Sequence, residues 1–189
     1  GKLVINEIMY NATNSYASYV ELYNTSTNTL SLGGLRIQGI DCEIGYGNMI
    51  GPTGYVVVAG NIPGYQCEYG NAEVVVAEYS GSLDNGGETI RLLMPLTTNT
   101  WQVVDEVKYD DDPPWPAQAD GGGPSLQLID ATLDNNRVGN WAVGASVLYT
   151  PGAPNSVAAS LPAFDRIWIS EVMPSNTASF KDNAGEYEP

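Results

Sequence analysis

The chain has 189 residues, with 22 acidic side chains, 7 basic ones and no histidine, so its formal net charge is −15. This charge argues against nucleic acid and anionic lipid as partners, because both are bound mainly through Lys and Arg. The absence of histidine excludes a Ser-His-Asp triad and an imidazole-ligated zinc, so a hydrolase would have to use carboxylates, lysine, tyrosine or a bound metal.

Charged residues make up only 15% of the chain, against about 25% in average domains. The surface is therefore expected to be rich in Asn, Thr, Ser, Gly and Tyr, which is typical of an extracellular module. No apolar run approaches the roughly 18 residues that a membrane-spanning helix needs, so membrane insertion is not expected.

Short runs rich in β-branched and aromatic residues follow one another along the chain, each bounded by Gly, Asn, Asp, Ser or Pro. Such runs predict strands, and no stretch shows sustained helical spacing with a cap at each end. The sequence therefore predicts an all-β fold, a sandwich or a barrel. In chain order the runs are LVINEIMY, SYVELYN, GLRIQG, GYVVVAG, EVVVAEY, ETIRLLMP, WQVVDEVKY and PSLQLID.

The two cysteines, Cys42 and Cys67, each lie in a Gly-rich, turn-like setting. Neither belongs to a C-x-x-C pair, so we predict that they form one disulfide between two loops. Such a bond would contribute on the order of 3 kcal/mol by the loop-entropy model, and an even cysteine count fits an oxidising compartment. A redox or metal-binding thiol is the alternative.

The order of several blocks resembles the lamin tail domain family in its bacterial secreted form. The blocks are INEIMYN, YVELYN, LSLGGLRI, GYVVVAG, GGETIRLL, VVDEVKYDDDPPWP, DGGGPSLQLID, DNN, NWA and TPGAPN. The resemblance covers residues 1–157 and implies an immunoglobulin-like β-sandwich. It also implies a module of a large secreted or surface protein, often repeated. Animal lamin tails are nuclear, but the acidic balance and the predicted disulfide point to a location outside the cell.

The segment RIWISEVMPSN near the C-terminus matches KLVINEIMYN near the N-terminus in residue type at almost every place. We therefore expect residues 165–189 to begin a second repeat, after a linker at 158–164. A strand without a partner exposes backbone hydrogen-bonding groups and seeks a sheet edge, in its own domain or in a neighbouring copy. The residues predicted to form this interaction strand are Ile167, Trp168, Ile169, Val172 and Met173.

Acidic residues concentrate after the predicted strand at 101–109. Calcium takes six to eight oxygen ligands, so it is the one cofactor that the sequence suggests, although the spacing does not match an EF-hand loop. The alternative is a solvated loop with turn-forming aspartates. The candidate ligands are Asp110, Asp111, Asp112 and Asp120, with Asp130, Asp134 and Asn135 further along.

Two tryptophans and two sequons complete the surface candidates. Trp115, held between prolines, could offer a platform for a sugar ring, but both it and Trp141 are expected to pack against the sandwich. Asn11 in NAT and Asn24 in NTS match the N-glycosylation sequon.

Glu7 and Glu21 lie in adjacent predicted strands and could face each other. Paired carboxylates at about 5.5 Å serve retaining glycosidases, but a hydrogen-bonding or anchoring role is the simpler interpretation. The sequence thus favours a non-catalytic structural or adhesive module that contacts neighbouring copies or domains. A calcium-assisted carbohydrate-binding module attached to a secreted enzyme, and a carboxylate hydrolase, are the other hypotheses.

Overall fold

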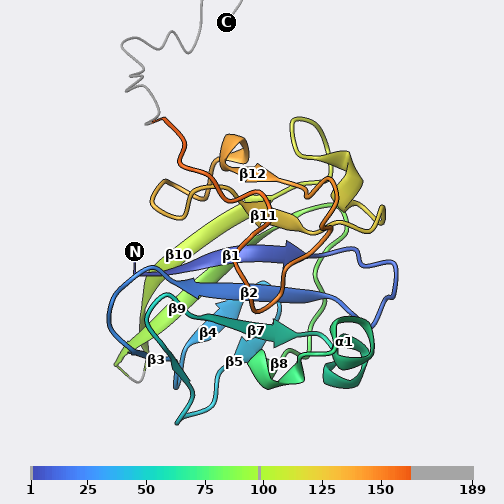
Figure 1. Ribbon diagram of the computed structural model, residues 1–189. Helices are drawn as coiled ribbons and strands as arrows, with labels where there is room; N and C mark the ends of the chain where they lie inside the picture. Colours follow the sequence, from blue (N-terminus) through green and yellow to red (C-terminus); the bar gives the residue numbers. More distant parts are fainter. Residues whose placement is uncertain (1, 98, 163–189) are drawn as a thin grey trace, which may run out of the picture.

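The computed structural model describes residues 2–97 and 99–162, which form a β-sandwich with one short helix (Figure 1). The larger sheet has the strand order β12-β11-β1-β2-β7-β8, and its strands are antiparallel except for the β7–β8 pair. Their bounds are β1 Leu3–Met9, β2 Tyr19–Asn24, β7 Tyr55–Ala59, β8 Val75–Glu78, β11 Leu126–Leu128 and β12 Trp141–Ala142.

The second sheet has the antiparallel order β10-β9-β4-β5. Its strands are β4 Arg36–Gln38, β5 Cys42–Glu43, β9 Glu88–Thr97 and β10 Thr100–Tyr109. A short ribbon pairs β3 (Leu30–Ser31) with β6 (Met49–Ile50). The expected all-β class and sandwich architecture are confirmed.

The main core lies between the two sheets. Ile37 of β4, with Ile90 and Leu92 of β9, is almost fully buried, as are Val20 and Leu22 of β2. Each such side chain contributes about 1.5–3 kcal/mol through burial. In β9 the buried and more exposed positions alternate at first, as expected for a strand with one face in the core and one toward water.

A second apolar cluster lies on the opposite face of the larger sheet. Met9, Tyr19 and Val57 are buried there beneath Tyr65 of helix α1 (Ile62–Tyr69). The orange segment near the end of the described chain crosses the front of β1 and β2 (Figure 1). The larger sheet is therefore covered on both faces.

The sequence did not predict helix α1, although the signals for its two ends are present. The side chain of Asn61 caps the N-terminus by accepting from the Gly64 N–H at 2.8 Å, Pro63 occupies the first turn, and Gly70 ends the helix in the left-handed region. Gly64 is required because a Cβ there would come within 2.4 Å of the Tyr16 carbonyl oxygen. A glycine inside an eight-residue helix hides the helical pattern.

Three 3-10 turns complete the described elements: η1 Ala72–Val74, η2 Ala117–Ala119 and η3 Val138–Asn140. Apart from η2, the long connection between β10 and β11 has no regular structure. No helix in the described ranges has the length and apolar character required to cross a membrane.

Candidate functional site

Glu7 and Glu21 lie directly opposite each other in β1 and β2, next to a bulge in β1. Both side chains are fully buried. They point to the face of the larger sheet that α1 covers, because Glu21 follows Tyr19 of the cluster beneath α1 by two residues in β2, and the Tyr19 hydroxyl bonds to Glu7. The prediction that these two carboxylates face each other is therefore correct.

Glu7 accepts four hydrogen bonds. Its Oε1 atom accepts from the hydroxyls of Tyr19 and Ser125, both at 2.5 Å, and from the Thr150 N–H at 2.9 Å, while its Oε2 atom accepts from the Thr150 hydroxyl at 2.9 Å. Burial raises the pKa of Glu7 above its ordinary value, and these donors act against that rise. The Glu7 carboxylate thus connects β1 to Tyr19 of β2, to Ser125 just before β11 and to Thr150.

Glu21 is held by fewer donors. Its Oε1 atom accepts from Asn6 Nδ2 at 2.8 Å and its Oε2 atom from the Gly152 N–H at 2.5 Å. Burial, and then the neighbouring charge of Glu7, raise the pKa of Glu21 to about 9. Because Glu7 has more donors, we place the negative charge of the pair on Glu7 and the shared proton on Glu21.

Asn155 continues the same network. Its Nδ2 atom donates to the carbonyl oxygens of Leu128 at 2.8 Å and Asn6 at 3.0 Å, and its Oδ1 atom accepts from Asn6 Nδ2 at 2.9 Å. Ser156 adds two bonds to the side-chain oxygen of Gln127, from its N–H and its hydroxyl. Residues 147–161, which we call the clasp segment, are thereby fastened across the larger sheet.

This arrangement suits anchoring and not glycoside hydrolysis. A glycosidase must present its two carboxyl groups to a sugar and a water, whereas both glutamates have zero exposure and use their oxygens for internal hydrogen bonds. Substrate has no access to them in this structure.

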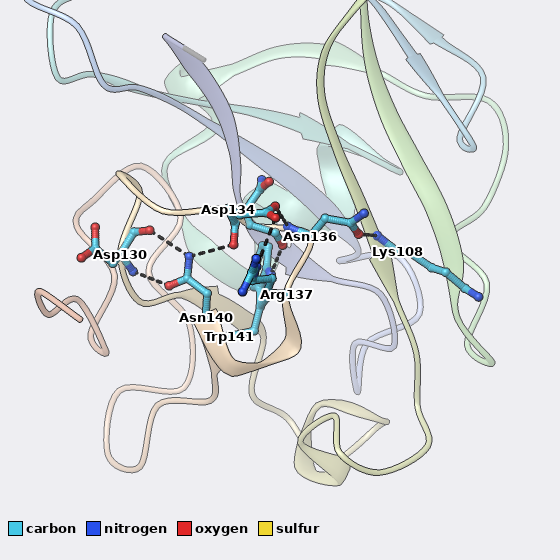
Figure 2. Close-up of polar contacts among 8 residues, drawn as sticks. Lys108, Asp130, Asp134, Asn136, Arg137, Asn140 and Trp141 are labelled. Carbon is cyan, nitrogen blue, oxygen red and sulfur yellow. Dashed lines mark hydrogen bonds and ion pairs between the residues drawn. The ribbon is translucent and has the colours of Figure 1, made fainter. Parts of the chain in front are cut away.

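A second polar cluster orders the loop between β11 and β12 (Figure 2). The Asn140 side chain bridges this loop, accepting from the Asp130 N–H at 2.9 Å and donating to the carbonyl oxygens of Asp130 at 2.9 Å and Asp134 at 3.4 Å. Asn136 joins the loop to β10 by accepting from the Lys108 N–H at 2.8 Å. The aspartates here act as turn-forming acceptors.

Asp105 links this loop to the start of β1. Its Oδ2 atom accepts from the Ile5 N–H at 2.7 Å and from Asn135 Nδ2 at 2.6 Å, and burial raises its pKa. The indole N–H of Trp141 donates to the Asn135 carbonyl oxygen at 2.6 Å. The DNN and NWA blocks therefore hold the two sheets together at this edge.

The four predicted calcium ligands are not gathered into one site. Asp110 accepts from the Asp112 N–H at 3.0 Å, and Asp120 accepts from Asn11 Nδ2 at 2.7 Å. Among the described residues, no group of three or more His, Cys, Asp or Glu side chains is placed to hold a metal ion. Calcium binding by these residues stays a prediction.

Trp115 is half-buried and packs against the main core beside Trp141, with 6.3 Å between ring centroids. This is the packing role expected for both rings, and a sugar contact at Trp115 stays a prediction. Asn11 is half-exposed. Asn24 is wrong as a glycan acceptor, because it is fully buried and its Nδ2 atom donates to the carbonyl oxygens of Asn28 and Gly51.

The predicted disulfide is also wrong in this structure, since both cysteines are free thiols. Cys42 faces the core from β5 in the smaller sheet, whereas Cys67 is exposed on α1, which covers the larger sheet. The sequence predicted loop positions for both cysteines, whereas Cys42 lies in β5 and Cys67 lies in α1, on the far side of the larger sheet.

The expected linker begins within the fold. Ala159 donates its N–H to the Ile129 carbonyl oxygen at 3.0 Å, and Leu161 donates to Asp130 Oδ2 at 2.9 Å. Residues 158–161 therefore lie against the sandwich. The interaction-strand residues Ile167, Trp168, Ile169, Val172 and Met173 lie outside the described residues.

A comparison with known protein families agrees with the fold and the contacts described above. The family model of the lamin tail domain matches residues 1–111, more than half of the chain. The chain belongs to the lamin tail domain family. This family has an immunoglobulin-like fold and a structural role. No curated protein and no solved structure matches the chain.

The folded unit of this lamin tail domain continues beyond the matched residues. β11 pairs with β1, β12 pairs with β11, and the clasp segment closes over Glu7 and Glu21. TPGAPN is the last of the sequence blocks that resemble the family, but the sequence did not predict the contacts that Thr150, Gly152 and Asn155 make. These three residues stand beside the two prolines of TPGAPN, which is the signal that the sequence offers. A single sequence does not show that they contact residues 131 to 149 positions away.

Proposed function

We propose that this lamin tail domain is a non-catalytic structural or adhesive module of a larger secreted or surface protein. It would join neighbouring copies or domains by β-strand pairing at a sheet edge. Family membership supports a structural or interaction role of the domain. The composition is acidic overall but has a low fraction of charged residues, which supports a location outside the cell. The disulfide no longer supports that location, because both cysteines are free.

The edge strand β10 is the observation that carries the proposal. It is ten residues long and ends the order of the smaller sheet, so in the described ranges only β9 pairs with it. Its second half is covered, because Asn136 accepts from the Lys108 N–H and Asp105 turns toward β1. Its first half leaves Val103 51% exposed. An open, apolar strand edge is a template for pairing with another strand.

A charge at the edge tests this pairing. Val103→Lys places a solvated cation on β10, a substitution that blocks edge pairing in natural sheets. Val147→Lys is the matched control, because Val147 is 50% exposed but lies in the clasp segment over the other sheet. We expect Val103→Lys to weaken self-association of the full chain by about tenfold or more, and Val147→Lys to leave it unchanged. Light scattering across a concentration series measures both.

Deletion of residues 165–189 tests which strand pairs with the edge. If those residues supply the connecting strand, the shortened chain loses any oligomer or filament that the full chain forms. Continued assembly of the shortened chain, or equal assembly of the two lysine variants, would overturn this mode of connection.

A further inference from the structure

A cavity of about 440 Å³ opens on the smaller sheet, beside the turn from β9 to β10. Cavities of roughly 300–1,000 Å³ are typical of small-molecule sites. Two aromatic side chains line it, Tyr46 from the loop between β5 and β6 and Trp101 from β10. Arg36 of β4 and Glu43 of β5 line it as well. The cavity therefore combines aromatic rings with one ion pair, and none of its lining residues belongs to the glutamate network.

Tyr46 is 85% exposed, yet the neighbouring backbone is shaped to its ring. A Cβ at Gly33 would lie 2.8 Å from the Tyr46 Cα and 3.0 Å from its Cδ1 atom. A Cβ at Gly34 would lie 3.1 Å from the Tyr46 hydroxyl oxygen and 3.5 Å from Pro95 Cγ. The ring thus lies along the Gly33–Gly34 backbone, and most of its surface is free. Aromatic rings of this kind offer a large contact area at a low cost in conformational entropy.

The Arg36 guanidinium is positioned from two sides. Its central carbon lies 4.3 Å from the centroid of the Trp101 ring, and its Nε atom donates to Glu43 Oε2 at 2.9 Å. Within residues 2–97 and 99–162, this is the only hydrogen bond of either side chain. The Nη atoms of Arg36 therefore keep their N–H donors, and Glu43 Oε1 keeps its lone pairs, for a ligand in the cavity.

The chemistry of the cavity selects among ligands. The charges of Arg36 and Glu43 cancel, and the chain as a whole carries −15, so an anion is not attracted. An apolar side chain would bury the Nη atoms and Oε1 without partners, which is costly. A sugar hydroxyl both donates and accepts, and a sugar whose hydroxyls are equatorial has a C–H face that packs on an aromatic ring. Such a neutral sugar satisfies the ion pair and Tyr46 together.

We propose that this cavity binds a neutral sugar chain of β-linked, glucose-type units. One sugar ring packs against Tyr46, its neighbouring hydroxyls accept from the Arg36 Nη atoms, and one hydroxyl donates to Glu43 Oε1. The site is distinct from Trp115, which packs beside Trp141. It does not depend on strand pairing at β10, so each can fail without the other.

Titration of the full chain with cellotetraose tests the site, followed by the NMR shifts of the Trp101 indole N–H and of the amides at 33–36 and 43–47. Tetragalacturonate tests an anionic sugar, and a capped tetraproline peptide tests an apolar protein partner. We expect saturable shifts with cellotetraose only, and an affinity that does not change as salt rises because the ligand is neutral. Equal binding of either comparison ligand, or no binding of cellotetraose, would overturn the proposal.

Two substitutions separate a ligand role from a folding role. Tyr46→Ala removes an exposed ring, so it should leave the Tm and self-association unchanged, yet weaken cellotetraose binding by about fivefold. Arg36→Gln removes the Nη donors and should weaken binding by about tenfold. Tyr16→Ala, at a tyrosine that is 67% exposed and absent from the cavity lining, is the matched control and should change neither. Unchanged binding in Tyr46→Ala and Arg36→Gln contradicts the proposal.

Discussion

The outer faces of the two sheets use glutamate in opposite ways. On the larger sheet, Glu7 and Glu21 have zero exposure and hold the clasp segment. On the smaller sheet, Arg36 and Glu43 form an ion pair at 2.9 Å, with side chains 50% and 52% exposed. These two point outward, because their neighbours Ile37 and Cys42 pair inward toward the core.

The contrast distinguishes the sheet face whose side chains stabilise the fold from the sheet face whose side chains are exposed to solvent. Removing a buried hydrogen-bond acceptor is costly, because its donors are left without an acceptor and no water replaces it. An exposed ion pair contributes only about 0–1 kcal/mol to stability. The face of the larger sheet is therefore closed and specified by long-range hydrogen bonds. The outer face of the smaller sheet carries exposed side chains, and the first half of its β10 edge is where we propose that a partner strand pairs.

The largest effect is expected from Glu7→Ala. It leaves four donors from Tyr19, Ser125 and Thr150 without their acceptor, so the free energy of unfolding should fall by about 3–5 kcal/mol. Glu43→Ala is the matched change on the open face and should cost no more than about 1 kcal/mol. Urea unfolding of both variants gives the comparison, and similar losses would contradict it.

Removal of the Asn155 side chain should open the clasp segment locally. Asn155→Ala breaks the bonds to Asn6 and Leu128, and we expect a loss of about 2 kcal/mol. Hydrogen exchange should speed up at the amides of Thr150 and Gly152, while amides of β9 keep their protection. Uniform acceleration over the whole chain would instead indicate that the clasp segment does not open on its own.

The pH dependence of stability follows from the raised pKa of Glu21, about 9 in the folded chain against an ordinary value of 4.5. Between these values the folded state holds one proton more than the unfolded state, so unfolding releases a proton and rising pH favours it. The contribution of this group is complete below pH 4.5 and is lost as the pH rises through 9.

Stability should thus decrease between pH 5 and pH 9, with a slope of up to about 1.4 kcal/mol per pH unit for one proton. Glu7 and Asp105, whose pKa values burial also raises, act in the same direction. Glu21→Gln should flatten the slope in thermal unfolding at a series of pH values. An unchanged slope in that variant would exclude Glu21 as its source.

The smallest effect is expected from reductant. Because Cys42 and Cys67 are free, added dithiothreitol and the Cys67→Ser variant should each leave the Tm unchanged. A disulfide between them would instead make both changes costly, by about 3 kcal/mol. A clear drop in Tm with either would restore the pairing that the sequence suggested.

The elements with strong local patterns could be predicted from the sequence. Each of the eight predicted strand runs contains a strand, since alternation and turn residues are local signals. The facing of Glu7 and Glu21 followed from their places in two neighbouring strands. The lamin tail family was identified from the order of its blocks.

What the sequence did not show depends on contacts between distant residues. Asn6 and Asn155 are hydrogen-bonded although 149 positions separate them. Asn24 matches a sequon, but its side chain is bonded to carbonyl oxygens at Ile50 and Gly51, which the sequence does not show. The predicted disulfide is wrong because Cys67 lies in a short helix, capped by Asn61 and Gly70, and not in a loop. Burial and layer assignment are properties of the folded chain, so local chemistry alone does not give them.

Carbon-13 NMR of the glutamate carboxyl groups tests the central claim most directly. The account predicts that at pH 7 the buried pair holds one proton, and that the Glu21 carboxyl ionises near pH 9 in the folded chain. If the carboxyl carbons of Glu7 and Glu21 both complete their titration below pH 6 while the chain stays folded, the two groups are solvated carboxylates. The clasp segment would then not be fastened by a buried pair.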